Sequence, residues 1–183
     1  MTATPHLDKI VALAQVRGYE REEHGRVEQV RPSLRKTLDW YASQHYAGLN
    51  DALRRGAVPA PLQQHVSELD RAFRESEPLK EPLVVYRGVQ DLGRDQERMV
   101  HPGGRIFDRA YVSTSATTAT PHSIGDRGTV MKITIPAGHR VLRPNPAEDE
   151  VLLPRSTALR VKSVDPQRTA GPFSFRHVEA EVA

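Results

Sequence analysis

Helix-like and strand-like segments occupy separate halves of this 183-residue chain. Before residue 80, apolar residues recur at helical spacing over 6–30, about 32–55 and about 61–76. From residue 83 on, β-branched and aromatic residues fill short segments between turn-forming residues, at 83–89, 105–115, 128–136, 149–154, 157–165 and 173–182. Helices and strands that are segregated in this way predict an α+β fold rather than an alternating parallel sheet.

The length of the chain fits one domain with a real core and hardly leaves room for two. We therefore expect a single domain over 1–183, with a helical part over about 1–80 and a β core over 82–183. No segment approaches the roughly 20 apolar residues that cross a bilayer, so no membrane contact is expected. The first residues do not form a signal-peptide pattern. We expect either export by another route, such as a fused carrier or a dedicated secretion machine, or a cytoplasmic location.

Composition excludes several kinds of site. The chain contains no cysteine, which rules out disulfides, thiolate metal sites and cysteine nucleophiles. Its eight histidines show no metal-ligand spacing, so we expect no metal. A net charge of +3 suits an anionic ligand but is too weak for the footprint of a nucleic-acid-binding protein. Neither a GxGxxG motif nor a P-loop follows a predicted strand.

Arg87 and Gly88 stand near the end of the predicted strand at 83–89. An arginine in this place can bind a phosphate or carboxylate through two parallel hydrogen bonds. A glycine beside it lets a ligand approach the backbone closely. The simpler alternative is an arginine in solvent on an edge strand, with Gly88 turning the chain.

A Ser-Thr-Ser sequence ends the segment 105–115, which is predicted to be a turn followed by a strand. On a strand, Ser113 and Ser115 face one side and Thr114 faces the other. Such small hydroxyl residues can hold a carboxylate in place and leave room for a flat ligand. Hydroxyl residues are also common where a strand passes into a loop, so a purely structural role for these three residues stays open.

Two glutamates stand one residue apart in PNPAEDEVLLPR, at 144–155. On a strand, Glu148 and Glu150 would face the same side, about 7 Å apart. They would repel each other and raise each other's pKa. This arrangement is useful where positive charge develops, as in the cleavage of a glycosidic bond. The alternative is an acidic turn before a strand, with ion pairs to Arg143 and Arg155.

The order of these three motifs resembles the arginine–serine–glutamate class of mono-ADP-ribosyltransferases, a family that includes bacterial exoenzymes. The resemblance covers about residues 31–180. Five segments are similar to family motifs: YAGLNDALRRG (46–56), EPLVVYRGV (81–89), GGRIFDRAYVSTS (103–115), ITIPAGHRV (133–141) and EDEVLLPRSTALRVKSV (148–164).

The resemblance implies a helical part packed on a β-sandwich core that binds NAD. It implies an enzyme that cleaves the nicotinamide–ribose bond and transfers ADP-ribose to an acceptor. Arg87 would hold a phosphate, and the backbone of Gly88 would hold the nicotinamide amide. Ser113 would hold Glu150, which would stabilise the cation-like ribose. Glu148 would orient the acceptor and take its proton.

Other matched positions imply further contacts with NAD. Asn50 and Arg54 are one helical turn apart and would reach its adenosine and phosphate part, although an exposed helix face explains that spacing equally well. Thr114 and Ser115 belong to the Ser-Thr-Ser strand of the site. Arg127 lies in the loop that faces the nicotinamide in the family.

The acceptor implied by Glu148 is an arginine of a target protein, since the family's asparagine- or glutamine-modifying branch has Gln there. The resemblance further implies a toxin-like, effector-like or phage-borne enzyme, and it allows for an immunity or carrier protein as partner. Three alternatives stay open: an NAD glycohydrolase, an enzyme that modifies nucleic acid, and a non-catalytic binding module. The presence of Arg87, Ser113 and both glutamates argues against the last.

Overall fold

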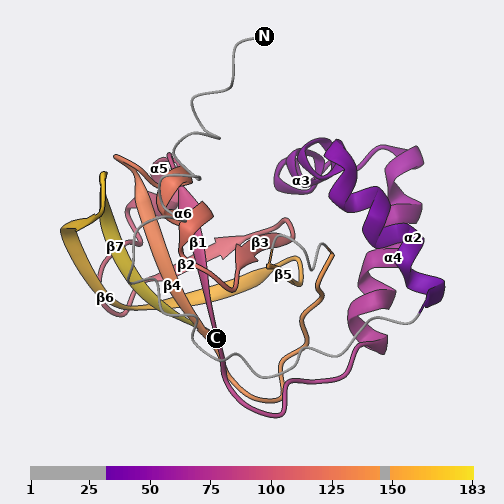
Figure 1. Cartoon of the computed structure of the whole chain (residues 1–183). Helices are drawn as coiled ribbons and strands as arrows, with labels where there is room; N and C mark the ends of the chain where they lie inside the picture. Colours follow the sequence, from indigo (N-terminus) through magenta and orange to yellow (C-terminus); the bar gives the residue numbers. More distant parts are fainter. Residues whose placement is uncertain (1–31, 145–148) are drawn as a thin grey trace, which may run out of the picture.

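The computed structural model describes residues 32–144 and 149–183 (Figure 1). The described helices are α2 (Pro32–Trp40), the π-helical η1 (Tyr41–His45), α3 (Tyr46–Arg55), α4 (Ala60–Glu75), α5 (Arg94–Glu97) and α6 (Ala119–Ile124). The described strands are β1 (Leu83–Val89), β2 (Arg105–Asp108), β3 (Val112–Ser115), β4 (Thr129–Ile135), β5 (Glu150–Leu153), β6 (Thr157–Ala170) and β7 (Phe173–Val182). The predicted α+β class is confirmed. The helix predicted over 6–30 lies outside the described residues.

The helical segments follow their sequence signals. The predicted helix over 32–55 is confirmed, but it contains the π-helical turn η1 between α2 and α3. A proline lies in the first turn of α4, where its missing N–H costs nothing. The helix ends where the Ser76 N–H donates to the Ala72 carbonyl and the backbone becomes extended. Its buried residues Leu69, Ala72 and Phe73 lie on one face, as their spacing predicts.

The described strands form one seven-stranded sheet in the order β2-β6-β7-β4-β1-β3-β5. The pair β4–β7 is parallel, and the other pairs are antiparallel. β1 pairs with β4 along its whole length, whereas it meets β3 at the pair Tyr86–Ser115. In Figure 1, β3 and β5 accordingly run in a different direction from β1 and β4.

The sheet bends around its own apolar core. One cluster of buried side chains takes residues from all seven described strands, among them Val85, Val112, Ile133, Val151 and Val178. Strands of one sheet can share a core only if the sheet curves over it. The strands thus enclose the core from two sides, as in the expected β-sandwich, and they are hydrogen-bonded into a single sheet that is joined across β1 and β3.

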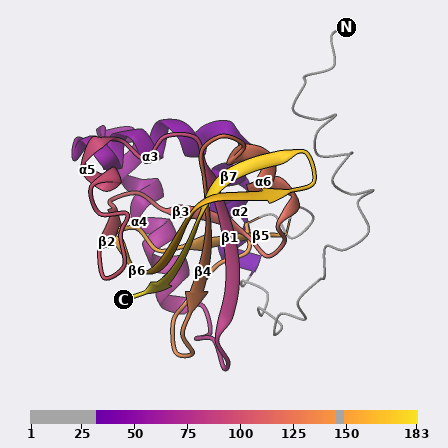
Figure 2. The ribbon, with the colours of Figure 1, turned by 90° about the vertical axis from the view of Figure 1, so that its left-hand side faces the viewer.

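Two strand predictions change in detail. The segment 105–115, predicted to be a turn followed by a strand, forms two strands, β2 and β3. The turn lies between them, where the Asp108 carboxylate accepts the Ala110 N–H. The hairpin predicted for 159–164 and 173–182 is confirmed, and β6 extends further, to Ala170. This long hairpin is yellow at the C-terminal end of the chain in Figure 2.

The helices α2, α3 and α4 cover the outer face of β3 and β5. These helices lie to one side of the strands in Figure 1. In Figure 2 the strands face the viewer, and the helices lie behind them. Alternation along β5 explains the contact: Val151 and Leu153 enter the sheet core, while Leu152 packs in a second cluster with residues of the helices. Tyr111, which is fully buried, stacks on Phe73 of α4 in that cluster.

Polar contacts hold α4 against the strands as well. The Arg155 guanidinium donates to both carboxylate oxygens of Asp70, with Nη2 at 2.7 Å from Oδ2. The Tyr111 hydroxyl lies 2.8 Å from the Asp70 Oδ1 atom. Burial and this carboxylate both raise the pKa of Tyr111, so its hydroxyl stays a donor. Asp70 thus connects α4 to the residues just before β3 and just after β5.

The helix α6 packs directly on the backbone of β1 at Gly88. A Cβ atom there would lie 2.1 Å from the Pro121 carbonyl oxygen and 2.7 Å from the Gly125 amide nitrogen. Backbone atoms cannot move aside as a flexible side chain can. Gly88 is therefore required for α6 to lie against β1, whatever its further use.

We predict that Gly88→Ala lowers the free energy of unfolding by about 1–3 kcal/mol, as overpacking usually does. Gly48→Ala, in α3, is a matched control: a Cβ atom at this position would have no neighbour within 4 Å, and alanine there should raise stability by about 0.5–1 kcal/mol. Urea unfolding followed by circular dichroism measures both. Equal stability of Gly88→Ala and the wild type would contradict the packing described for α6.

Candidate active site

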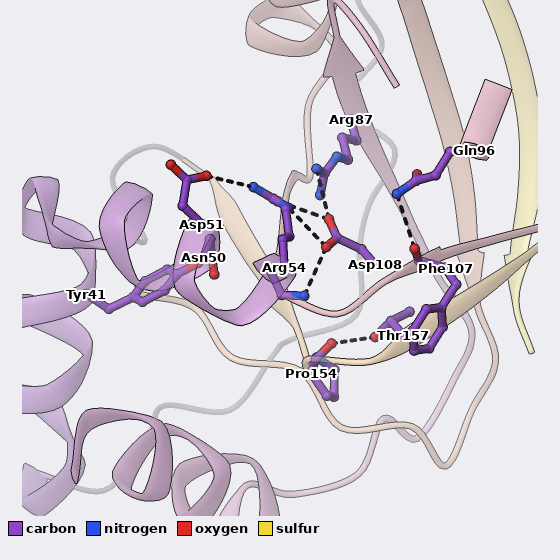
Figure 3. Close-up of polar contacts among 11 residues, drawn as sticks. Tyr41, Asn50, Asp51, Arg54, Arg87, Gln96, Phe107, Asp108, Pro154 and Thr157 are labelled. Carbon is purple, nitrogen blue, oxygen red and sulfur yellow. Dashed lines mark hydrogen bonds and ion pairs between the residues drawn. The ribbon is translucent and has the colours of Figure 1, made fainter. Parts of the chain in front are cut away.

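Asp108, at the end of β2, holds two arginines from two other elements (Figure 3). Its Oδ1 and Oδ2 atoms accept from Nε and Nη2 of Arg54 on α3, at 3.1 and 3.0 Å. The same Oδ2 atom lies 3.5 Å from Nη2 of Arg87 on β1. Three elements that are distant in sequence therefore meet at one carboxylate.

The two arginines lie in different surroundings. The hydrogen bond to Asp108 raises the pKa of Arg54, whose side chain is 42% exposed. The Arg87 side chain is 21% exposed, and burial lowers its pKa, against the opposing effect of Asp108. Both guanidiniums stay charged, since the unperturbed pKa of arginine is far above 7. The group of Arg54, Arg87 and Asp108 thus keeps an excess of one positive charge.

Asn50 lies one turn before Arg54 in α3 and is only 5% exposed. Its Nδ2 atom donates to the hydroxyl of Tyr41 at 2.9 Å. Its Oδ1 atom is buried and has no hydrogen-bond partner in the described part of the chain. A buried amide with an unused acceptor is costly unless something else pairs with it, so Asn50 is a candidate for ligand contact.

The pairing of β3 with β5 brings Ser113 to Glu150. In the register of this pair Ser113 lies opposite Leu152, and Ser115 lies opposite Glu150. The Ser113 Oγ atom donates to Oε1 of Glu150 at 2.7 Å, a short bond as expected for a charged acceptor. Glu150 is the first residue of β5 and is partly exposed, so its carboxylate is fixed at the rim of the sheet.

The other two Ser-Thr-Ser hydroxyls are used within the protein. Thr114 is buried, faces the opposite side of β3, and donates to the Val151 carbonyl. The Oγ atom of Ser115 accepts the Thr117 N–H at 3.1 Å and stabilises the turn that follows β3. These contacts leave Ser113 as the hydroxyl that meets the glutamate.

The Tyr41 hydroxyl accepts the hydrogen bond from Asn50. Burial is the main cause that raises the pKa of this hydroxyl, and the charge of Glu150 adds to it, while the bond from Asn50 and the charges of Arg87 and Arg54 lower it. Tyr46, one turn before Asn50 on α3, is 47% exposed beside Tyr41, with 6.1 Å between the ring centroids.

Two predicted site residues remain. Glu148 lies outside the described residues. β5 begins at Glu150, and Asp149 has a φ of 53°, so the strand predicted over 149–154 begins one residue later. Arg127 is exposed in the turn before β4, and its N–H donates to the Ser174 carbonyl. It does not join the two arginines that Asp108 holds.

Arg143 and Arg155, the arginines expected to pair with the glutamates if these form an acidic turn, bind two aspartates. Arg143 lies 3.4 Å from Asp149, and Arg155 binds Asp70 on α4. Both arginines therefore fix the ends of the segment around β5.

Sequence reasoning missed Asp108 and Tyr41. Asp108 stands within the segment GGRIFDRAYVSTS, which was matched to the family only as a whole. The one feature of the sequence that could have singled out Asp108 is its place just before the turn to β3. Tyr41 is one of the apolar residues that recur at helical spacing over 32–55, and it packs in the cluster beneath the helices. That pattern does not show that its hydroxyl binds Asn50.

The described residues show neither a metal cluster nor a membrane-spanning helix. No three side chains of histidine, aspartate or glutamate gather among them in a way that could hold a metal ion. None of the helices over 32–144 and 149–183 is long and apolar enough to cross a bilayer.

Structural comparison finds the same fold in bacterial toxins. Plx2a, an ADP-ribosyltransferase toxin from Paenibacillus larvae, superposes with a TM-score of 0.71 at 20% identity, over 84% of this chain and 87% of that one. The C3 exoenzyme of Clostridium limosum gives a TM-score of 0.69 at 19% identity, over 96% of this chain and 90% of that one. At these identities the likeness establishes the fold.

Sequence comparison identifies the family. The chain is 30% identical to secreted exoenzyme S of Pseudomonas aeruginosa over 127 residues, which are 68% of this chain and 27% of that protein. The chain thus spans about a quarter of this relative. A family model described as ADP-ribosyltransferase exoenzyme matches residues 19–174, most of the chain. This protein therefore belongs to the ADP-ribosyltransferase exoenzyme family of bacterial toxins.

Proposed function

We propose that this chain is an NAD-dependent mono-ADP-ribosyltransferase that modifies arginine in a target protein. The observation that supports this most directly is the 2.7 Å hydrogen bond from Ser113 to Glu150, together with the two arginines that share one carboxylate. A fixed carboxylate suits a ribose that becomes cation-like, and paired guanidiniums suit a pyrophosphate. The family uses NAD as substrate, and no metal enters the proposal.

The proposed reaction is a substitution at C1 of the nicotinamide ribose. The bond from C1 to the ring nitrogen breaks, and its electron pair leaves with nicotinamide, which becomes neutral. A guanidine nitrogen of the acceptor forms the new bond to C1 and loses one proton, which Glu148 accepts. Glu150 hydrogen-bonds the ribose hydroxyl and stabilises the positive charge that develops at C1 and its ring oxygen.

The remaining residues bind the cofactor in this proposal. Arg54 and Arg87 hold the pyrophosphate, and Asn50 uses its unpaired Oδ1 atom toward the adenosine part. The backbone of Gly88 binds the nicotinamide amide. Thr114 and Ser115 support this site through the strand that carries Ser113. Arg127, in the turn near the end of β1, acts on the nicotinamide side.

The acceptor and setting are further parts of the proposal. Glu148, as a carboxylate, suits a guanidinium acceptor, since the two can form parallel hydrogen bonds. Residues 1–183 would form one catalytic domain. The similarity to a secreted exoenzyme and to toxins supports delivery into a target cell, with an immunity or carrier protein as a further partner.

The function is tested by incubating the protein with NAD labelled in its adenine part and with a host lysate. We expect nicotinamide release together with label on a protein band, removed by protease and not by nuclease. Mass spectrometry of the labelled band should place the adduct on arginine. Nicotinamide release without any labelled macromolecule would indicate an NAD glycohydrolase, and no release at all would contradict the proposal.

Substitution of the two glutamates should affect transfer and NAD hydrolysis differently. Glu150→Gln should abolish both transfer and NAD hydrolysis, by about 10³-fold or more, because charge stabilisation at C1 is lost. Glu148→Gln should keep hydrolysis within about threefold and reduce transfer at least about 100-fold, since only the acceptor loses its base. Glu81→Gln, at an exposed position just before β1, is the matched control. Normal hydrolysis by both site variants would contradict the assignment.

Ser113→Ala should reduce kcat of nicotinamide release about tenfold, the usual effect of losing one hydrogen bond to a charged group. Ser163→Ala is a matched control, because Ser163 makes a similar bond to Glu179 on the β6–β7 hairpin at 3.2 Å. Steady-state kinetics of both variants measures the difference. Equal loss in both would show that Ser113 acts through stability alone.

A further inference from the structure

We infer that Asp108 is a positioning residue, whose carboxylate holds Arg54 and Arg87 side by side for the pyrophosphate of a dinucleotide. This rests on the proposed function, because it assigns the arginines to the phosphates of NAD. Asp108 itself would not contact the reacting atoms. Its role was not apparent from the three motifs of the sequence, and it follows from where the fold brings the two arginines.

The geometry leaves the arginines able to bind a ligand. Asp108 takes the Nε and Nη2 edge of Arg54 through two nearly parallel hydrogen bonds. The Nη1 group of Arg54 has a distant contact, 3.7 Å from the exposed Asp51 carboxylate. Arg87 meets Asp108 through Nη2. A guanidinium has five N–H donors, so each arginine keeps donors for a phosphate.

Asp108 is itself fixed. Its Oδ1 atom accepts the Ala110 N–H at 2.9 Å, and its side chain is 12% exposed. It ends β2, where it pairs with Thr157 of β6. The carboxylate is therefore oriented by backbone contacts, and the flexible arginine side chains align on it rather than the reverse.

Charge explains why such a residue is needed. The positive charges of Arg54 and Arg87 repel each other, and Arg87 is also largely removed from water. One carboxylate between them offsets this repulsion in the free enzyme. Arg54, half in solvent on a long side chain, would otherwise move away and would have to be ordered again on binding. The group still carries one net positive charge for an anionic ligand.

The opposite view is that Asp108 competes with phosphate for the arginines. A competitor would occupy the donors that the ligand uses, and its removal would tighten binding. The contacts favour positioning, because Asp108 binds Arg54 along its side edge and leaves the Nη1 end open toward other partners. If Asp108 positions the arginines, its removal weakens NAD binding; if Asp108 competes with phosphate, its removal tightens NAD binding.

The test is the variant Asp108→Asn. Its amide oxygen can still accept the Ala110 N–H, so the turn is kept while the charge is lost. We expect KM for NAD in nicotinamide release to rise about tenfold, with kcat within about twofold, as for a loss of ground-state and transition-state binding alike. An unchanged or lowered KM overturns the inference.

A double-mutant cycle separates positioning from stability. In the Arg54→Ala background, Asp108→Asn should change KM for NAD much less than it does in the wild type, since its main partner is gone. Additive effects overturn the inference. Asp70→Asn is the matched control: Asp70 binds Arg155 through both oxygens away from the arginine group, and this variant should leave KM for NAD unchanged.

A binding measurement distinguishes failure of the inference from failure of the proposed function. Inorganic pyrophosphate and ADP-ribose are titrated into the wild type and Asp108→Asn by calorimetry, which needs no turnover. We expect about tenfold weaker binding of both ligands by the variant, a loss of one charge-assisted contact. Equal binding by the two proteins, or no binding by the wild type, overturns the inference. Weakened binding with no nicotinamide release from any protein would support the inference and contradict the enzymatic proposal.

Discussion

The pairing of β3 with β5 is the contact on which both the core and the candidate site depend. Val112 of β3 and Val151 of β5 enter the core inside the sheet, while Leu152 of β5 packs against the helices. The same register brings Ser113 to Glu150. Stability and site geometry therefore rest on one pair of strands. A slip by a single residue would turn every side chain of β5 to the wrong face and separate the serine from the glutamate.

The site lies where the helical part meets this strand pair. Asn50 and Arg54 come from α3, Arg87 from β1, and Ser113 and Glu150 from β3 and β5. Asp108 connects the arginines, and Tyr41 on η1 binds Asn50 through its hydroxyl. A dinucleotide is long enough to need contacts of both kinds, positive groups at the phosphates and a carboxylate at the ribose. Both kinds of group lie along the seam where α3 meets the strands β1, β3 and β5. Neither the helical half nor the strand half of the chain would therefore form the site alone.

The sequence allowed much of this to be predicted, for physical reasons that differ between its parts. Period-two alternation is a local property, so β1, β4 and the β6–β7 hairpin were located well from residues that face the core. The strand β2 was missed because a turn was predicted at the start of 105–115, whereas the turn follows Asp108, whose side chain bonds to the backbone two residues on. The contact of Arg54 with Asp108 joins residues 54 positions apart, and no local pattern contains it. Gly88 was expected to let a ligand approach its backbone; the structure adds a second reason for glycine, since α6 packs on it.

The central claim is that one NAD molecule lies across this seam, with its pyrophosphate at Arg54 and Arg87 and its nicotinamide ribose at Glu150. A crystal structure of the Glu150→Gln variant with NAD tests it most directly, because slow turnover keeps the substrate intact. The account predicts phosphate oxygens within hydrogen-bond distance of both guanidiniums, at about 2.7–3.2 Å, and a ribose hydroxyl at the side chain of residue 150. NAD bound away from Arg87 and residue 150 would contradict it.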